Sequence, residues 1–199
     1  MSVNQTTVLL ALHLQNEVIH PEGRIFAGFG GPSGDRRPFI RAAQHVLLGA
    51  TLNEIPRIFV RMAFRANGID LPDNCELYRT VKLNEVMTEG SWGAEFFDEL
   101  APNLSTDIII SHNRVNAFYA SELDSVLRTL ECGKLILFGV ATHSVVEHSA
   151  RHAVDMGYEV TIVDDACHAH PFQKHQASLA SIENLVTVVN CHQLSFSRV

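Results

Sequence analysis

The chain has 199 residues, of which 46% are hydrophobic and 19% charged, so it can form the core of one domain and a disordered chain is excluded. Its net charge of -7, from 15 Lys and Arg against 22 Asp and Glu, argues against nucleic acid and anionic membrane surfaces as partners. No targeting pattern is visible, and the four cysteines form no CxxC pair. We therefore expect a single cytoplasmic domain over 1–199.

Short apolar runs rich in Val and Ile alternate with segments of helical periodicity. The strands are predicted at 7–14, 57–63, 107–111, 134–140, 158–164 and 185–189. The helices are predicted at 37–50, 121–130, 142–156 and 172–183. Strands that are almost continuously hydrophobic are buried on both faces, as in parallel sheets. The pattern predicts an α/β fold: a three-layer α/β/α arrangement with a doubly wound, mainly parallel six-stranded sheet.

Two stretches do not fit the alternation. Residues 22–34 contain five glycines and a proline, which indicates a loop. Residues 65–92 have mixed polarity and no firm period. A connection of that length in a compact domain is often functional, so we expect a lid over the sheet.

The ends of the strands are where ligands bind in an open parallel sheet. The first strand ends at His13, Leu14, Gln15 and Asn16, and the third continues into 112–118. The fourth continues through 139–146 directly into a helix. A junction of this kind exposes backbone N–H groups that suit an oxyanion.

Four segments in order resemble the isochorismatase-like cysteine hydrolases. These are Leu9–Glu17 (LLALHLQNE), Glu89–Phe118, Gly139–His152 and Gly157–Ala166. The resemblance covers nearly the whole chain and implies a six-stranded parallel sheet between helices. It also implies a homo-oligomer, either a dimer or a tetramer, and a cis peptide bond between Val140 and Ala141.

The family's hydrolytic Asp, Lys and Cys correspond to His13, His112 and Val145 in this sequence. A valine has no nucleophilic atom, and none of the four cysteines falls at this position. Our first hypothesis is a family member that has lost the cysteine mechanism and is catalytically degenerate or binds a small molecule. The alternative is a hydrolase of non-cysteine mechanism, in which His13 and His112 transfer protons on a small amide, carbonyl or vinyl ether substrate.

Residues beside the three positions are candidates for contact with that small molecule: Gln15, Trp92, Phe118, Ala141, Thr142 and His143. Each also has a structural reading, as a hydrogen-bonding, core or helix-start residue. Two imidazoles that titrate near pH 6.5 would bind a carboxylate better as the pH falls from about 7.5 to 6.

No cofactor and no metal are predicted. Asp164 and Asp165 end the fifth strand, where capping or solvated carboxylates are common. The histidines at 168, 170 and 175 match no zinc signature, so we expect surface positions for them.

Overall fold

The computed structural model describes residues 6–196 and contains one six-stranded sheet. The strand order is β3-β2-β1-β4-β5-β6, and every pairing between neighbours is parallel. The strands are β1 (Thr6–Leu12), β2 (Arg57–Met62), β3 (Ile108–His112), β4 (Cys132–Val140), β5 (Glu159–His168) and β6 (Thr187–Val189). The predicted parallel sheet is confirmed.

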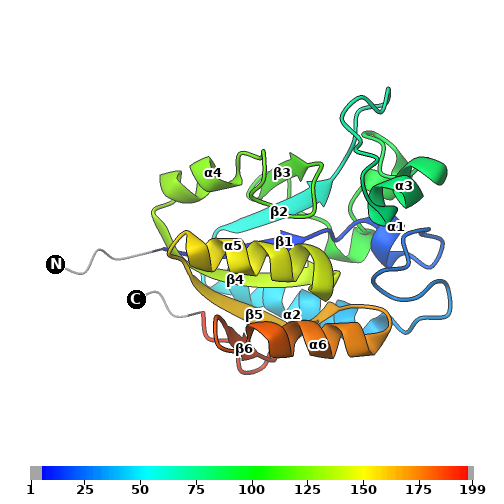
Figure 1. Ribbon diagram of the computed structural model, residues 1–199. Coiled ribbons are helices and arrows are strands. Elements are labelled where there is room, and N and C mark those ends of the chain that lie inside the picture. The colour runs from blue at the N-terminus through cyan, green and yellow to red at the C-terminus, as the bar shows by residue number, and fades with distance from the viewer. Residues whose placement is uncertain (1–5, 197–199) are drawn as a thin grey trace.

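Helices cover both faces of the sheet, which completes the three layers. The helices that cover the faces are α2 (Arg37–Leu52), α4 (Leu123–Thr129), α5 (Glu147–Asp155) and α6 (Phe172–Ile182). The chain first moves outward from β1 to β3 and then returns through β4 to β6, so right-handed crossovers place α2 on one face and α4, α5 and α6 on the other. Figure 1 shows α5 and α6 in front of the sheet and α2 behind it.

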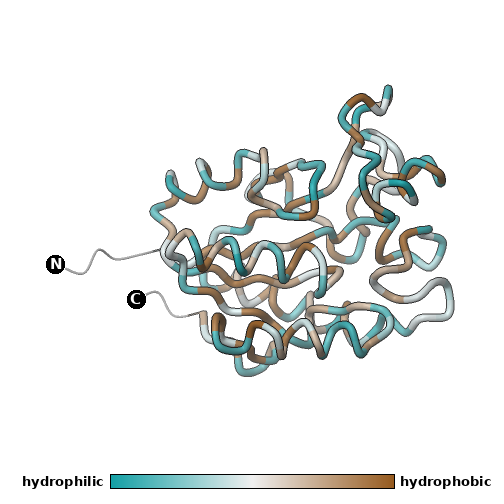
Figure 2. Tube along the Cα trace, viewed as in Figure 1, coloured by the Kyte–Doolittle hydropathy of each residue, from teal (hydrophilic) through white to brown (hydrophobic). Residues whose placement is uncertain are grey.

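The core lies on the central strands. Val8 to Leu12 of β1 have no exposed surface, and the neighbouring β4 buries Leu135 to Phe138. Figure 2 shows hydrophobic colour along these strands and mixed colour along the helices, as expected for amphipathic helices on a sheet buried on both faces. No helix of residues 6–196 is both long and apolar enough to cross a membrane.

Several element boundaries differ from the predicted ones. β1 stops at Leu12 because His13 adopts a left-handed backbone conformation, with φ of +55°. The helix expected at 142–156 is divided into a π-helical turn, Thr142–Val146, and α5. The strand β5 continues to His168, ten residues in all.

The stretch 65–92 is not an unstructured lid over the sheet. It contains α3 (Glu76–Leu83), whose Tyr78 and Val81 are buried. Figure 1 shows α3 and the short helix α1 (Asn16–Ile19) beyond the carboxyl ends of the strands. Two 3₁₀ turns, at Trp92–Ala94 and Asp98–Leu100, complete the connection to β3. This connection therefore borders the edge of the sheet where the site is expected.

Candidate active site

His13 and His112 meet at the carboxyl ends of the strands, with their Nε2 atoms 2.6 Å apart. His13 follows β1 and His112 ends β3, so the two rings meet across the end of the intervening β2. The backbone N–H of His13 donates to the carbonyl of Val60 in β2. A positive φ costs a non-glycine residue about 1–2 kcal/mol, and such conformations cluster at functional sites. The backbone of His13 is therefore strained at the position that orients its imidazole ring.

The acceptors around the pair determine its proton positions. His112 Nδ1 lies 3.3 Å from the backbone oxygen of Asn116, which can only accept a hydrogen bond. Neutral His112 therefore carries its proton on Nδ1, and its Nε2 accepts the N–H of His13 Nε2. This tautomer leaves the lone pair of His13 on Nδ1, which has no hydrogen-bond partner among residues 6–196. The pair thus presents one unengaged basic atom.

Both imidazoles are neutral at pH 7. Burial lowers the pKa of His112 to about 4, although its hydrogen bond to Asn116 opposes the shift. Burial also lowers the pKa of His13 well below its usual value, and a charge on His112 lowers it further. The expected carboxylate binding between about pH 7.5 and 6 is therefore wrong for this pair, because neither ring gains a proton in that range. At the matched positions, the resemblance implies a carboxylate and an ammonium, so two neutral rings keep the same total charge.

Val145 is fully buried in the π-helical turn after β4. The end of β4 pairs with the end of β1, Gly139 beside Leu12. Gly139 has φ of +138°, and a Cβ there would lie 2.1 Å from the Leu12 carbonyl oxygen, so only glycine fits this approach. The peptide bond between Val140 and Ala141 is cis, which confirms the geometry that the family resemblance implies.

Thr142 begins this turn and is tied to α6 and β5. Its hydroxyl lies 2.8 Å from His175 Nδ1, and His175 Nε2 lies 2.8 Å from the carboxylate of Asp164. The carboxylate accepts from Nε2–H, so Nδ1 accepts the Thr142 hydroxyl proton. His175 is therefore buried, with 3% of its surface exposed, and the surface position expected for it is wrong. Thr142 is also fully buried, so this chain of hydrogen bonds holds the turn in place.

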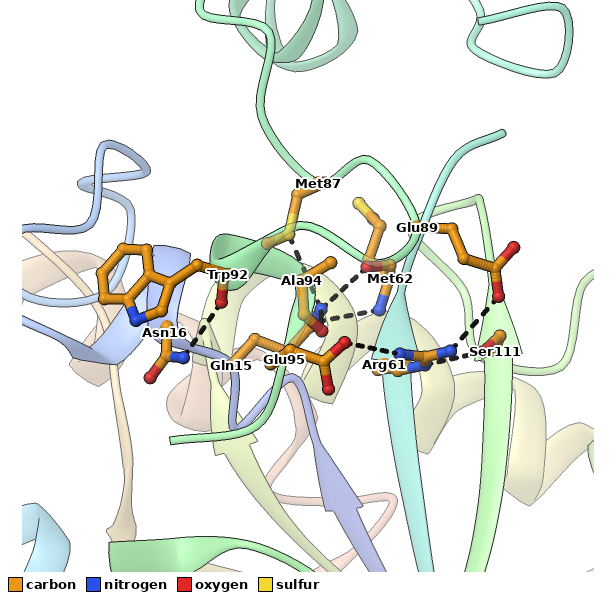
Figure 3. A network of polar contacts seen from close by, with 10 residues as sticks. All are labelled: Gln15, Asn16, Arg61, Met62, Met87, Glu89, Trp92, Ala94, Glu95 and Ser111. Atoms are coloured by element: carbon orange, nitrogen blue, oxygen red, sulfur yellow. Dashed lines mark hydrogen bonds and ion pairs between the residues drawn. The ribbon is translucent and has the colours of Figure 1, made fainter. Parts of the chain in front are cut away.

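Gln15 anchors the connection before β3 to the sheet, as Figure 3 shows. Its Nε2 donates to the carbonyls of Met62 and Ala94, and its Oε1 accepts the N–H of Met62. A substrate contact through Gln15 would have to displace one of these bonds. The neighbouring Asn16 donates to the carbonyl of Trp92, also in Figure 3.

The same network reaches the outer strands through Arg61 of β2. Its guanidinium contacts Ser111 Oγ of β3 and the carboxylates of Glu89 and Glu95 (Figure 3). The segment 87–95 is therefore fastened to Gln15 and Asn16, which follow β1, and to Arg61 of β2, at the edge that carries the histidine pair. The position of segment 87–95 is therefore fixed by hydrogen bonds and ion pairs to other parts of the chain, and not by a pattern of hydrophobic residues within the segment.

The other predicted contact residues lie in different surroundings. Ala141 is buried beside the cis bond, and Phe118 is buried and stacks on His152 with ring centres 4.9 Å apart. Trp92 is about half exposed and lines a hollow that also includes His20 and Phe97. His143 is half-buried, and its Nδ1 is buried without a hydrogen-bond partner. Their roles as substrate contacts remain predictions.

Asn116 was not among the predicted site residues, although it fixes the tautomer of His112. Its carbonyl holds His112 Nδ1, its Nδ2 lies 3.1 Å from His152 Nδ1, and its Oδ1 accepts the N–H of Phe118. The only signal in the sequence is its place four residues after His112. Within residues 6–196, no three His, Cys, Asp or Glu side chains are grouped so that they could hold a metal ion.

Comparisons with known proteins agree with the fold. Residues 7–193 match the isochorismatase domain. A cysteine hydrolase from Pseudomonas syringae pv. phaseolicola superposes with a TM-score of 0.84 at 22% identity, over 97% of this chain and 96% of that one. N-carbamoylsarcosine amidase from Thermoplasma acidophilum superposes with a TM-score of 0.75 at 21% identity, over 96% and 99% of the two chains.

Curated relatives include ureidoacrylate amidohydrolases. The one from Methylobacterium radiotolerans is 28% identical over 191 residues, which is 89% of this chain and 73% of the relative. The one from Acinetobacter baylyi is 36% identical over 100 residues, and that match covers 50% of this chain and only 40% of the relative. Because the domain match spans nearly all described residues and the sheet agrees with it, this chain belongs to the isochorismatase family.

Proposed function

We propose that this protein hydrolyses a small amide or ureido compound, with a water molecule as nucleophile and the His13–His112 pair as the base. The observation that carries the proposal is the buried neutral pair itself, joined by a 2.6 Å hydrogen bond with His13 Nδ1 left unengaged. The names of the curated relatives, which are amidohydrolases, support the choice of amide or ureide bonds.

The pair can take up and return one proton during such a reaction. Water attacks the carbonyl carbon as His13 Nδ1 accepts its proton, and a C–O bond forms. The proton on His13 Nε2 can then pass to His112 Nε2, so that the positive charge is shared between two rings. When the C–N bond breaks, the same path returns the proton to the leaving nitrogen. No covalent intermediate arises, because Val145 offers no nucleophilic atom.

The low pKa values favour an amide over a vinyl ether. Hydrolysis of a vinyl ether begins with protonation of carbon, which requires an acid that holds a proton at the working pH. With the pKa of His112 at about 4, the pair is deprotonated at pH 7 and acts as a base. A base of low pKa is weak, so we expect a rate enhancement near the lower end of the roughly 10²- to 10⁴-fold that general bases typically supply.

A second candidate function is binding of a small molecule without turnover. It is favoured by the burial of all three matched positions, with His13 7%, His112 4% and Val145 0% exposed. Under this candidate, the histidine pair is a neutral structural substitute for an ion pair.

A substrate screen tests both candidates. Purified protein is incubated with small amides, ureides, nitriles and isochorismate at pH 7.5, and products are followed by mass spectrometry. The proposal predicts turnover of an amide or ureide, none of isochorismate, and no mass adduct on the quenched protein. Absence of turnover across the panel would favour the second candidate, and an adduct on Thr142–Val146 would contradict the water mechanism.

A further inference from the structure

The hollow that Trp92 lines is separate from the histidine pair. Its volume is about 640 Å³, and its walls come from α1 and the two residues after it, from the start of α2, and from the segment 92–99. Neither His13 nor His112 belongs to its lining. Cavities that hold small molecules have volumes of about 300–1,000 Å³, so this hollow is large enough for a ligand of its own.

Aromatic rings form one side of the hollow. The Trp92 indole and the His20 imidazole meet edge to face, with ring centres 5.0 Å apart and an angle of 86° between the ring planes. The ring of Phe97 lies 6.0 Å from that of His20. Trp92 is nevertheless 49% exposed, and no Lys or Arg side chain of residues 6–196 lies over its ring. The electron-rich face of an indole attracts cations more strongly than any other aromatic side chain does, so this ring is available to a cationic ligand.

The backbone that carries Trp92 is held in place. The carbonyl of Trp92 accepts a hydrogen bond from Asn16 Nδ2 at 2.9 Å and another from the N–H of Glu95 at 3.2 Å. Figure 3 shows the first of these bonds, and it shows the indole on the side of its backbone that faces away from Arg61. This wall of the hollow is therefore formed before a ligand arrives, which reduces the entropy that binding would cost.

The charged side chains of the lining leave an excess of negative charge. The carboxylates are those of Glu95, Asp98 and Glu99, and the one guanidinium is that of Arg37. Arg37 Nη1 donates to both carboxylate oxygens of Glu99, at 3.1 and 2.9 Å, so these two charges balance each other. Glu95 has a single ion-pair contact, at 3.8 Å from Arg61, and the Asp98 side chain makes no hydrogen bond or ion pair within residues 6–196. The hollow therefore offers carboxylate charge that no cation of the described chain neutralises closely.

The arrangement suits an organic cation better than a metal ion. A hard metal ion such as Ca²⁺ requires about six to eight oxygen ligands at once, and the described chain groups no three ligand side chains for a metal. A quaternary ammonium has no N–H to donate and spreads its charge over methyl groups. It therefore binds through contact with aromatic faces and through the field of nearby carboxylates, and the hollow supplies both.

We propose that this hollow binds a small organic cation that carries a quaternary ammonium group, with the methyl groups against Trp92 and the charge balanced by Asp98 and Glu95. The site is a second small-molecule site of the domain. It does not include the histidine pair, so the proposal does not rest on the proposed hydrolysis and can be measured without turnover.

The test compares choline with dimethylbutanol, its uncharged analogue in which carbon replaces the nitrogen, by titration of the whole protein at pH 7.5. Trp92 is the only tryptophan of the chain, so tryptophan fluorescence reports directly on the hollow. Choline chloride replaces sodium chloride at constant ionic strength, which removes general effects of salt. We expect a saturable change in emission with choline and binding at least about fivefold tighter than that of dimethylbutanol. No saturable change, or equal binding of the two probes, would overturn the proposal.

Three variants locate the binding. Asp98→Asn keeps the shape of the side chain and removes its charge, so it should weaken choline about threefold or more and leave dimethylbutanol unchanged. Asp155→Asn is the matched control, because it removes the same charge from an exposed residue at the end of α5, outside the hollow, and should change neither probe. Trp92→Leu, followed by calorimetry, keeps an apolar side chain without the ring and should abolish the preference for choline. An unchanged preference in Trp92→Leu, or equal effects of Asp98→Asn and Asp155→Asn, would overturn the assignment of the site.

Discussion

Replacing His112 by leucine should change how stability depends on pH, because the pair is neutral and buried. In the unfolded chain a histidine titrates near 6.5, whereas in the folded protein the pKa of His112 is about 4. Between these values the unfolded state binds a proton that the folded state does not, so stability falls as the pH falls from 6.5 to 4. Above 6.5 both states are neutral and this contribution is absent.

The size of the effect follows from the shift. A difference of about 2.5 pH units at 1.36 kcal/mol each corresponds to a loss of about 3 kcal/mol between pH 7 and pH 4. His112→Leu removes this loss. At pH 7 it leaves His13 Nε2–H without an acceptor and the Asn116 carbonyl without its donor, which costs about 2 kcal/mol. The two proteins should therefore have equal stability near pH 5, and the variant should be the more stable one at pH 4.

Urea unfolding followed by circular dichroism at pH 7, 6, 5 and 4 measures this crossing. Ile110→Val serves as the control, because it removes one buried methylene from the same strand and introduces no change in titration. It should lower stability by about 1 kcal/mol at every pH. A constant difference between wild type and His112→Leu across the series would show that His112 titrates normally and would refute the neutral pair.

Three further outcomes follow from the structure. Gly139→Ala should lower the free energy of unfolding by more than about 3 kcal/mol or prevent folding, because the added Cβ meets the Leu12 carbonyl oxygen. Gly157→Ala is the control: no atom lies within 4 Å of its Cβ, so it should cost only about 1 kcal/mol, for its positive φ. Urea unfolding compares the two variants. Thr142→Val should lower the free energy of unfolding by about 1–3 kcal/mol, since it leaves His175 Nδ1 without a donor, and an unchanged value would show that the bond contributes nothing. Iodoacetamide at pH 7.5 should leave Cys132, Cys167 and Cys191 unmodified in the native protein, because burial raises the pKa of all three thiols. Peptide mass mapping measures the labelling, and rapid modification of any of the three would contradict this expectation.

The architecture could be predicted because it depends on local patterns. Strands such as β1 and β4 are apolar on both faces, and alternation with helices determines the crossovers. The boundaries at the site were less accurate, since β1 ends where His13 takes a positive φ and the helix after β4 begins as a π-helical turn. Neither the positive φ nor the π-helical turn produces a periodic pattern of hydrophobic residues that the sequence would reveal.

The contacts inside the site depend on tertiary structure. The motif resemblance selected His13, His112 and Val145, but only the fold shows that the first two form a hydrogen-bonded pair. The loss of basicity comes from burial, which a reference pKa does not include. The role of Asn116 likewise follows from the tertiary structure, because its backbone oxygen is the acceptor that lies beside His112 Nδ1. The predicted dimer or tetramer remains a prediction.

The rate of the His13→Asn variant on the amide or ureide identified in the screen tests the central claim most directly. Asparagine tolerates a positive φ, so the backbone at this position is retained while the basic nitrogen is removed. We expect a fall in kcat of at least about 100-fold, within the range for loss of a general base. A kcat within about threefold of wild type, with folding confirmed by urea unfolding, would show that the histidine pair does not perform the reaction.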